Sequence, residues 1–225
     1  PPPPPPLPLL MVLTCARCSP GHFSRAWSRL SKRLTPAARA AYERLVASRQ
    51  PAGSPPEHVH VYPAGAPGGG GPIGGPFNAW LRSPVLADQV VGLGTVLRYR
   101  TSLTPRLNEL AILLVAAQWR ASYAWASHAA MARRAGLGDE VFEAVAAGRR
   151  PELTGADENA VYDVCTMLLE KRTLDDAAYG RGVEHLGEAG VVELVSLVGY
   201  YVMVCMTLAA FKVAPGPGAG PTPFS

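Results

Sequence analysis

Glu109 and His128 stand nineteen positions apart and are the best candidates in the sequence for acid–base chemistry. A histidine has an ordinary pKa of about 6.5, so His128 can donate or accept a proton at neutral pH. A carboxylate beside it could hold the imidazole in one tautomer or relay the proton. Such a pair suits general acid–base catalysis, in which a side chain gives a proton to a reacting atom or takes one from it. Without further support, a surface acid and a buried structural histidine explain the same two residues.

The two side chains can cooperate only if the chain turns back between them. Residues 106–135 contain neither Gly nor Pro, so the local pattern predicts helix throughout. One straight helix at a rise of about 1.5 Å per residue would separate the two residues by about 28 Å. The polar run Gln118-Trp119-Arg120 offers a break. Ser122 is then the predicted N-cap of a second helix, from Tyr123 to Gly136.

The rest of the chain is predicted to form helices that pack around this stretch. Apolar residues recur every three or four positions, and no segment alternates apolar and polar residues for long, so the fold class is all-α. Leu86, Val90, Leu93 and Leu97 form the predicted core stripe of one helix. The other predicted helices are 34–49 with Thr35 as its cap, 77–81, 84–100, 105–117, 139–147, 157–171, 174–186 and 191–211.

Length and composition predict one helical domain with tails. The domain spans 34–213 and includes a flexible Gly- and Pro-rich loop at 50–76, and 214–225 is a predicted disordered tail. Segment 1–33 lacks acidic residues, which is typical of either a transit peptide or a disordered extension. The predicted location is therefore cytoplasmic, or organellar if the segment is a transit peptide.

The net charge of +4 is unevenly distributed. The first 42 residues carry six basic and no acidic side chains, so the remainder has a net charge of −2. Because the domain has no excess of Lys or Arg, no nucleic-acid partner is predicted.

The cysteines predict neither a metal site nor a disulfide framework. Cys15, Cys18 and His22 form C-x-x-C-x3-H, but a zinc site usually needs four ligands and no second pair lies nearby. Cys165 and Cys205 lie in apolar helical runs and are predicted to be buried.

The last predicted helix is long and apolar. Residues 194–211 form an uncharged run of eighteen, which is long enough to suggest a membrane span. Glu193 near its start and the polar Ser196 and Thr207 favour a helix buried in its own bundle or at a subunit interface. No membrane span is therefore predicted.

Several short motifs follow one another in a definite order. The pattern E-x18-H runs from Glu109 to His128 and ends in the W-x-x-H of Trp125 to His128. The run A-R-R-A-G-L follows it, and the segments 75–84, 104–110 and 193–201 carry further motifs. This order resembles the carboxymuconolactone decarboxylase and alkylhydroperoxidase D-like family over about residues 34–213. The resemblance implies a helical bundle that assembles as a homo-trimer or hexamer and needs no cofactor. It also implies that Glu109 and His128 are the catalytic residues.

The sequence departs from the peroxidase branch of that family. A C-x-x-C pair precedes the histidine there, and the corresponding residues here are Ala121 and Ala124. Peroxide reduction by a dithiol needs a thiolate nucleophile and a resolving thiol. Peroxidase chemistry at this position is therefore not predicted. The compact decarboxylases of the family lack a segment like Gly75-Pro76-Phe77 and do not have W-x-x-H in this form. The identity of the substrate is therefore open.

Three functions remain open. The favoured one is a cofactor-free acid–base lyase acting on a small cyclic or aromatic carboxylic acid. In it Arg120 would clamp the carboxylate, Tyr123 would donate a hydrogen bond, and Trp119 and Trp125 would form an apolar wall. The second is a peroxiredoxin-like antioxidant. The third is a non-catalytic oligomeric ligand binder, in which side chains would fill or occlude the pocket between Glu109 and His128.

Overall fold

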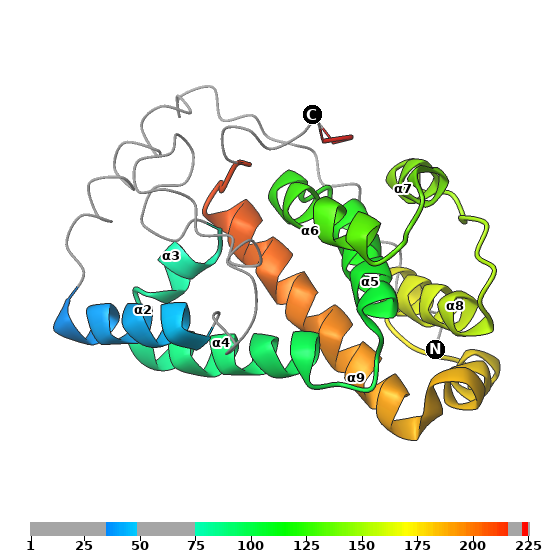
Figure 1. The fold of residues 1–225 in the computed structure, drawn as a ribbon, viewed down its shortest axis with the longest axis horizontal. Helices are drawn as coiled ribbons and strands as arrows, with labels where there is room; N and C mark the ends of the chain where they lie inside the picture. The colour runs from blue at the N-terminus through cyan, green and yellow to red at the C-terminus, as the bar shows by residue number, and fades with distance from the viewer. Residues whose placement is uncertain (1–34, 49–74, 216–221, 225) are drawn as a thin grey trace, which may run out of the picture.

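The computed structural model describes residues 35–48, 75–215 and 222–224, which form helices and no strand (Figure 1). The all-α prediction is confirmed for these residues. The predictions for 1–33, for Cys15, Cys18 and His22, and for most of the loop 50–76 lie outside them. The helices are α2 (Pro36–Ser48), α3 (Phe77–Trp80), α4 (Pro84–Tyr99), α5 (Pro105–Gln118), α6 (Ser122–Arg134), α7 (Asp139–Ala146), α8 (Ala156–Lys171) and α9 (Asp176–Ala210).

Helix α5 is the centre of the core. Its ten consecutive residues from Leu107 to Ala116 are all buried. Helices α6, α8 and α9 pack around it (Figure 1). A helix surrounded by other helices is expected to be apolar around most of its circumference. Because Glu109 lies within the buried part of α5, this helix places its carboxylate in the interior.

The chain leaves α5 through a tight turn at Trp119–Ala121. The N–H of Arg120 donates to the carbonyl of Ala117 at 2.9 Å, and the N–H of Ala121 donates to the carbonyl of Ala116 at 2.8 Å. This is the Schellman pattern that ends many helices, although the residue with positive φ is Arg120 (φ 47°) rather than Gly. The predicted break between the two ionisable residues is confirmed.

The predicted cap of the next helix is wrong by one position. Helix α6 begins at Ser122 itself, Ala121 occupies the N-cap, and no side chain caps this end. The turn places Ser122 inside the helix because two Schellman hydrogen bonds already set the direction of the chain. The other end agrees with the prediction, since Gly136 (φ 91°) follows the helix and ends it.

Two of the four residues predicted as the core stripe of α4 lie on the surface. Leu86 and Leu93 are 48% and 47% exposed, whereas Val90 and Leu97 are buried together with Ala87. Because α4 is apolar around much of its circumference, spacing alone could not select the inward face. The exposed apolar side chains are available to a second subunit, and the trimer or hexamer stays a prediction.

Helix α9 joins the two predicted C-terminal helices across a bend. Gly187 has non-helical angles there (φ 74°, ψ 166°). By length and hydropathy α9 could cross a membrane, but half of its most apolar window is buried in the protein. The core helix of a soluble protein meets the same criterion, so α9 gives little support to a membrane span.

The C-terminal tail contains a packed residue. The Phe224 ring lies 5.2 Å from the Trp125 ring in an edge-on arrangement and 5.8 Å from the Arg120 guanidinium. At residues 222–224 an aromatic side chain thus finds partners in the helical body, and disorder of the tail 214–225 stays a prediction.

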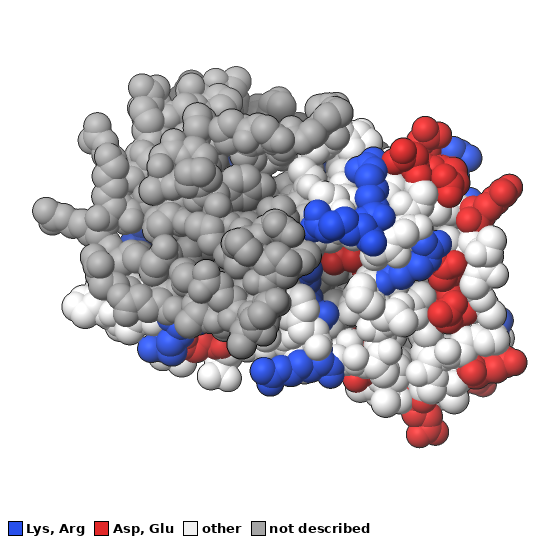
Figure 2. Space-filling model, viewed as in Figure 1, with Lys and Arg blue, Asp and Glu red and all other residues white. Residues whose placement is uncertain are grey.

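Charged side chains of both signs mix on the surface. Figure 2 shows Lys and Arg interspersed with Asp and Glu on the described part of one face. Asp163, for example, pairs with both Arg150 and Arg181. The absence of a nucleic-acid partner stays a prediction.

Replacement of Arg172 by Gly is expected to stabilise the protein. Arg172 is exposed and ends α8 with φ 60°, a conformation that costs a non-glycine residue about 1 kcal/mol or more. After the higher chain entropy of Gly is deducted, we expect a gain of about 0.5 kcal/mol and a Tm increase of about 1–2 °C. Lys171→Gly, one residue earlier and inside the helix, should lower Tm. Calorimetry of both variants checks this, and equal shifts would contradict it.

Candidate active site

Glu109 and His128 meet in the core. His128 Nδ1 lies 2.7 Å from Glu109 Oε2, and the two side chains are 9% and 7% exposed. Arg98 on α4 donates from Nη2 to the other oxygen, Oε1, at 3.3 Å. Each oxygen of the carboxylate therefore has its own partner, from a different helix.

The Glu109 carboxyl is held in its ionised form. Burial alone would raise its pKa, but the charge and hydrogen bonds of His128 and Arg98 outweigh burial, and the pKa lies below its ordinary value. Burial also disfavours the charged form of Arg98, yet Tyr201, Tyr99 and Glu109 together raise its pKa. Arg98 and Glu109 therefore both stay charged and form an ion pair, and His128 is hydrogen-bonded to Glu109.

This arrangement assigns roles to the two nitrogens of His128. An ionised carboxylate can only accept a hydrogen bond, so Nδ1 of His128 must carry a proton and donate it to Glu109. In the neutral imidazole Nε2 is then the basic nitrogen, and in the charged form it is a second donor. Nε2 is thus the atom suited to exchange a proton with a ligand.

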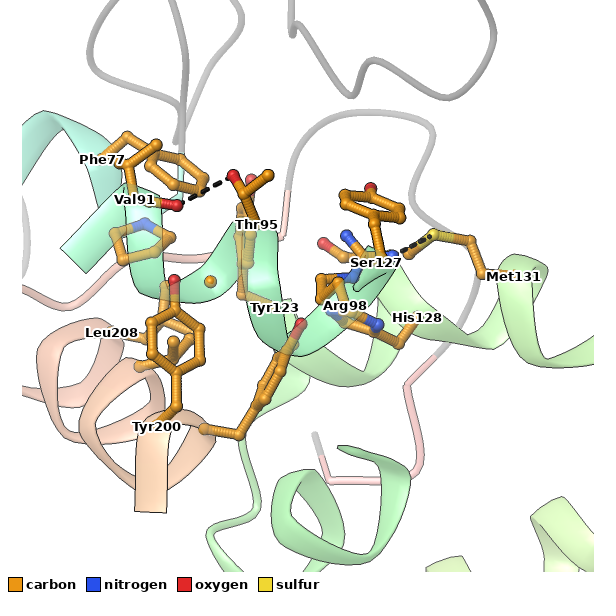
Figure 3. Close-up of a pocket in the computed structure, with 16 residues that line it drawn as sticks. Phe77, Val91, Thr95, Arg98, Tyr123, Ser127, His128, Met131, Tyr200 and Leu208 are labelled. Atoms are coloured by element: carbon orange, nitrogen blue, oxygen red, sulfur yellow. Dashed lines mark hydrogen bonds between the residues drawn. The ribbon is translucent and has the colours of Figure 1, made fainter. Parts of the chain in front are cut away.

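A cavity of about 90 Å³ lies beside His128 (Figure 3). On the same measure one water molecule needs roughly 10–15 Å³, so the cavity has room for a small organic molecule. Three helices each line it with one stripe of side chains, and Pro76 and Phe77 complete the wall. The stripes comprise Val91, Gly94, Thr95, Arg98 and Tyr99 of α4; Tyr123, Ala124, Ser127, His128 and Met131 of α6; and Tyr200, Tyr201, Val204 and Leu208 of α9.

Aromatic side chains pack tightly at this wall. The Tyr201 ring stands edge-on to the His128 imidazole, with centroids 5.1 Å apart. Gly94 allows the Tyr200 hydroxyl to lie against α4, because a Cβ at that position would collide with it. Gly inside a helix costs about 0.5–1 kcal/mol, and here it makes room for a tyrosine in the cavity wall.

Ser127 lines the cavity immediately before His128 in the chain (Figure 3). Its Oγ is buried and has no hydrogen-bond partner among the described residues. Buried hydroxyls are nearly always paired, so this oxygen is suited to a polar atom of a ligand.

Of the four residues predicted to bind substrate, Tyr123 lines the cavity and three do not. Arg120 lies in the turn before α6, beside Phe224. Trp119 is 39% exposed in the same turn, and Trp125 packs against Phe142. At about 100° per residue, Trp125 lies roughly 130° around α6 from the centre of the cavity-lining stripe. Arg120, Trp119 and Trp125 therefore lie away from this cavity, and their role in binding a substrate stays a prediction.

Arg98, and not Arg120, is the described arginine that lines the cavity. The stripe of α4 that lines the cavity is otherwise uncharged, and Arg98 follows Gly94 in it by one helical turn. A lone charge in such a stripe is a usable sequence signal. Ser127 offered no such signal, because an unpaired hydroxyl is visible only in the folded protein.

The described cysteines do not supply the missing thiols. Cys165 and Cys205 are free and buried, and burial raises the pKa of both thiols. Neither lines the cavity, whereas Ala124 does. The prediction that both cysteines are buried is confirmed. Among the described residues, no group of three or more His, Cys, Asp or Glu side chains is placed to hold a metal ion.

Residues 84–166 match the model of the Carboxymuconolactone decarboxylase family. The match covers 83 of the 225 residues. The resemblance predicted from the sequence is confirmed there, and the match supports a fold of the carboxymuconolactone decarboxylase and alkylhydroperoxidase type. The matched segment contains Arg98, Glu109 and His128, whereas Tyr200 and Tyr201 of the cavity wall lie beyond it. No curated protein matches the sequence.

Proposed function

We propose that the cavity is the active site of a cofactor-free acid–base lyase that acts on a small cyclic or aromatic carboxylic acid. The observation that carries this proposal is the buried hydrogen bond from His128 Nδ1 to Glu109, beside a cavity that His128 lines. Arg98 replaces Arg120 as the cation that attracts the substrate anion.

The proposed reaction begins with a substrate carboxylate near Arg98 and with His128 protonated. The bond between the carboxylate carbon and the ring carbon breaks, carbon dioxide leaves, and the electron pair stays on the substrate as an enolate-like anion. Nε2 of His128 then gives its proton to that carbon, which leaves the imidazole neutral. Water returns the proton before the next turnover.

Glu109 and Arg98 support this step without reacting. The Glu109 carboxylate stabilises the charged imidazole and holds its orientation, as the aspartate does in serine-protease triads. Arg98 stabilises the negative charge that develops on the substrate. Because the site is largely buried, both effects act with little screening by water.

The two other functions have less support. A dithiol peroxidase lacks its cysteines, since Ala121 and Ala124 occupy those positions and the described cysteines lie elsewhere. A binder with a filled pocket does not account for the open cavity beside His128.

The test is release of carbon dioxide from a panel of cyclic and aromatic acids with one or two carboxylates, and 4-carboxymuconolactone, which has two, is one of them. We expect turnover of at least one acid, and His128→Asn should lower kcat by about 10²–10⁴. His185→Asn is the matched control, because His185 lies on α9 and does not line the cavity. Equal turnover in folded His128→Asn and wild type would reject His128 as the acid–base group, and no turnover of any acid would reject the lyase.

A further inference from the structure

The charges around the cavity limit what it can bind. Arg98 is the one permanently charged side chain among the described residues that line it, and no described Asp or Glu side chain does so. Glu109 stands directly behind the wall and neutralises Arg98. With neutral His128 the three groups sum to zero, and with protonated His128 they sum to +1.

A buried anion needs a compensating charge, because an unpaired charge in the interior is strongly disfavoured. The centre provides one unit of positive charge, and only when His128 takes up a proton. One anionic group on the ligand is therefore balanced, whereas a second would have no partner among the described residues.

The remaining wall suits an apolar ring. Phe77, Tyr123, Tyr200 and Tyr201 supply aromatic surface, and burial raises the pKa of the Tyr201 hydroxyl, which keeps it uncharged. Ser127 adds a buried hydroxyl with no partner among the described residues. A planar ring with one carboxylate matches both parts of the wall.

We propose that the cavity selects ring-containing monocarboxylates over dicarboxylates, and that binding is coupled to protonation of His128. The inference rests on the proposed function in taking this cavity as the substrate site. The groups that face His128 from the surrounding helices are consistent with this coupling. Among the described residues they include Arg98 of α4, Glu109 of α5, Tyr123 of α6, and Tyr200 and Tyr201 of α9.

The test is calorimetric titration of the full chain with three probes of similar shape. These are 3-carbamoylbenzoate with one charge, isophthalate with two, and the neutral isophthalamide. At pH about 8, where an ordinary histidine is mostly neutral, the monoanion should bind at least about tenfold more tightly than either other probe. Titrations in two buffers of different ionisation enthalpy should show proton uptake with the monoanion.

Variants separate the site from general charge effects. His128→Gln should abolish proton uptake, and Arg98→Gln should remove the preference for the monoanion. Arg98→Lys, which keeps the charge, covers the case in which Arg98→Gln does not fold. Arg100→Gln is the matched control, because this exposed arginine lies two residues away and does not line the cavity.

The outcomes also separate this inference from the proposed reaction. Equal or tighter binding of isophthalate, absence of proton uptake, or no binding of any probe would overturn the inference. Monoanion binding with proton uptake but no carbon dioxide release would leave the inference standing and reject the lyase. Turnover of a dicarboxylic acid without binding of the monoanion would support the lyase and overturn the inference.

Discussion

Glu109→Gln is expected to lower kcat for the acid that the wild type decarboxylates by about 10²–10⁴. The amide is neutral, so it no longer stabilises the protonated imidazole of His128. Its NH₂ group can also donate to Nδ1, which would move the imidazole proton to Nε2 and give the wrong tautomer. The expected loss is therefore mainly in kcat rather than in KM.

Two measurements check this expectation. Steady-state kinetics give kcat, and nitrogen NMR of the histidine ring reports the tautomer without needing a substrate. Glu193→Gln is the control, because Glu193 binds Ser102 and does not line the cavity. If folded Glu109→Gln kept kcat within about threefold of wild type, Glu109 would not be the positioning group.

Arg106→Leu is expected to cause a large loss of stability. Arg106 on α5 donates from Nε to Glu158 of α8 and from Nη1 to the carbonyl of Gly136, after α6. Glu158 is buried, so removal of Arg106 leaves a carboxylate without its charged partner. Loss of one partner of a fully buried pair costs about 3–5 kcal/mol, but the Arg106 side chain is 35% exposed, so we expect a loss of about 2 kcal/mol and a fall in Tm of about 4–8 °C.

Thermal unfolding of two further variants tests the cause. Arg106→Leu combined with Glu158→Leu should recover part of the loss, because the unpaired charge is then absent. Arg44→Leu should change Tm much less, since Arg44 and Asp88 form an exposed pair. A fall in Tm of the same size in both single variants would contradict the assignment.

Local signals in the sequence were sufficient for several features of the helices. The long uncharged run of α5, the Thr35 cap of α2 and the end of α6 at Gly136 follow from apolar period, capping chemistry and glycine conformation. The turn between Glu109 and His128 was also predictable, because two cooperating residues cannot lie about 28 Å apart. These features depend on residues that are close in the chain.

The composition of the cavity could not be predicted in this way. Arg98, Ser127 and Tyr201 come from three helices, and their meeting depends on which face each helix turns inward. On α4 several faces are apolar enough to be buried, so spacing suggested Leu86 and Leu93 as core residues although packing leaves both exposed.

The sequence by itself therefore determined an all-α chain, because the spacing of apolar residues restricts the fold class. The facing Glu109–His128 pair followed from the family resemblance together with a break in the helical pattern between the two residues. Only the tertiary structure decided that Arg98 rather than Arg120 completes the pair and that tyrosines of α9 line the cavity. The physical reason is that these contacts depend on the burial of whole helix faces, which is settled by the packing of all helices together.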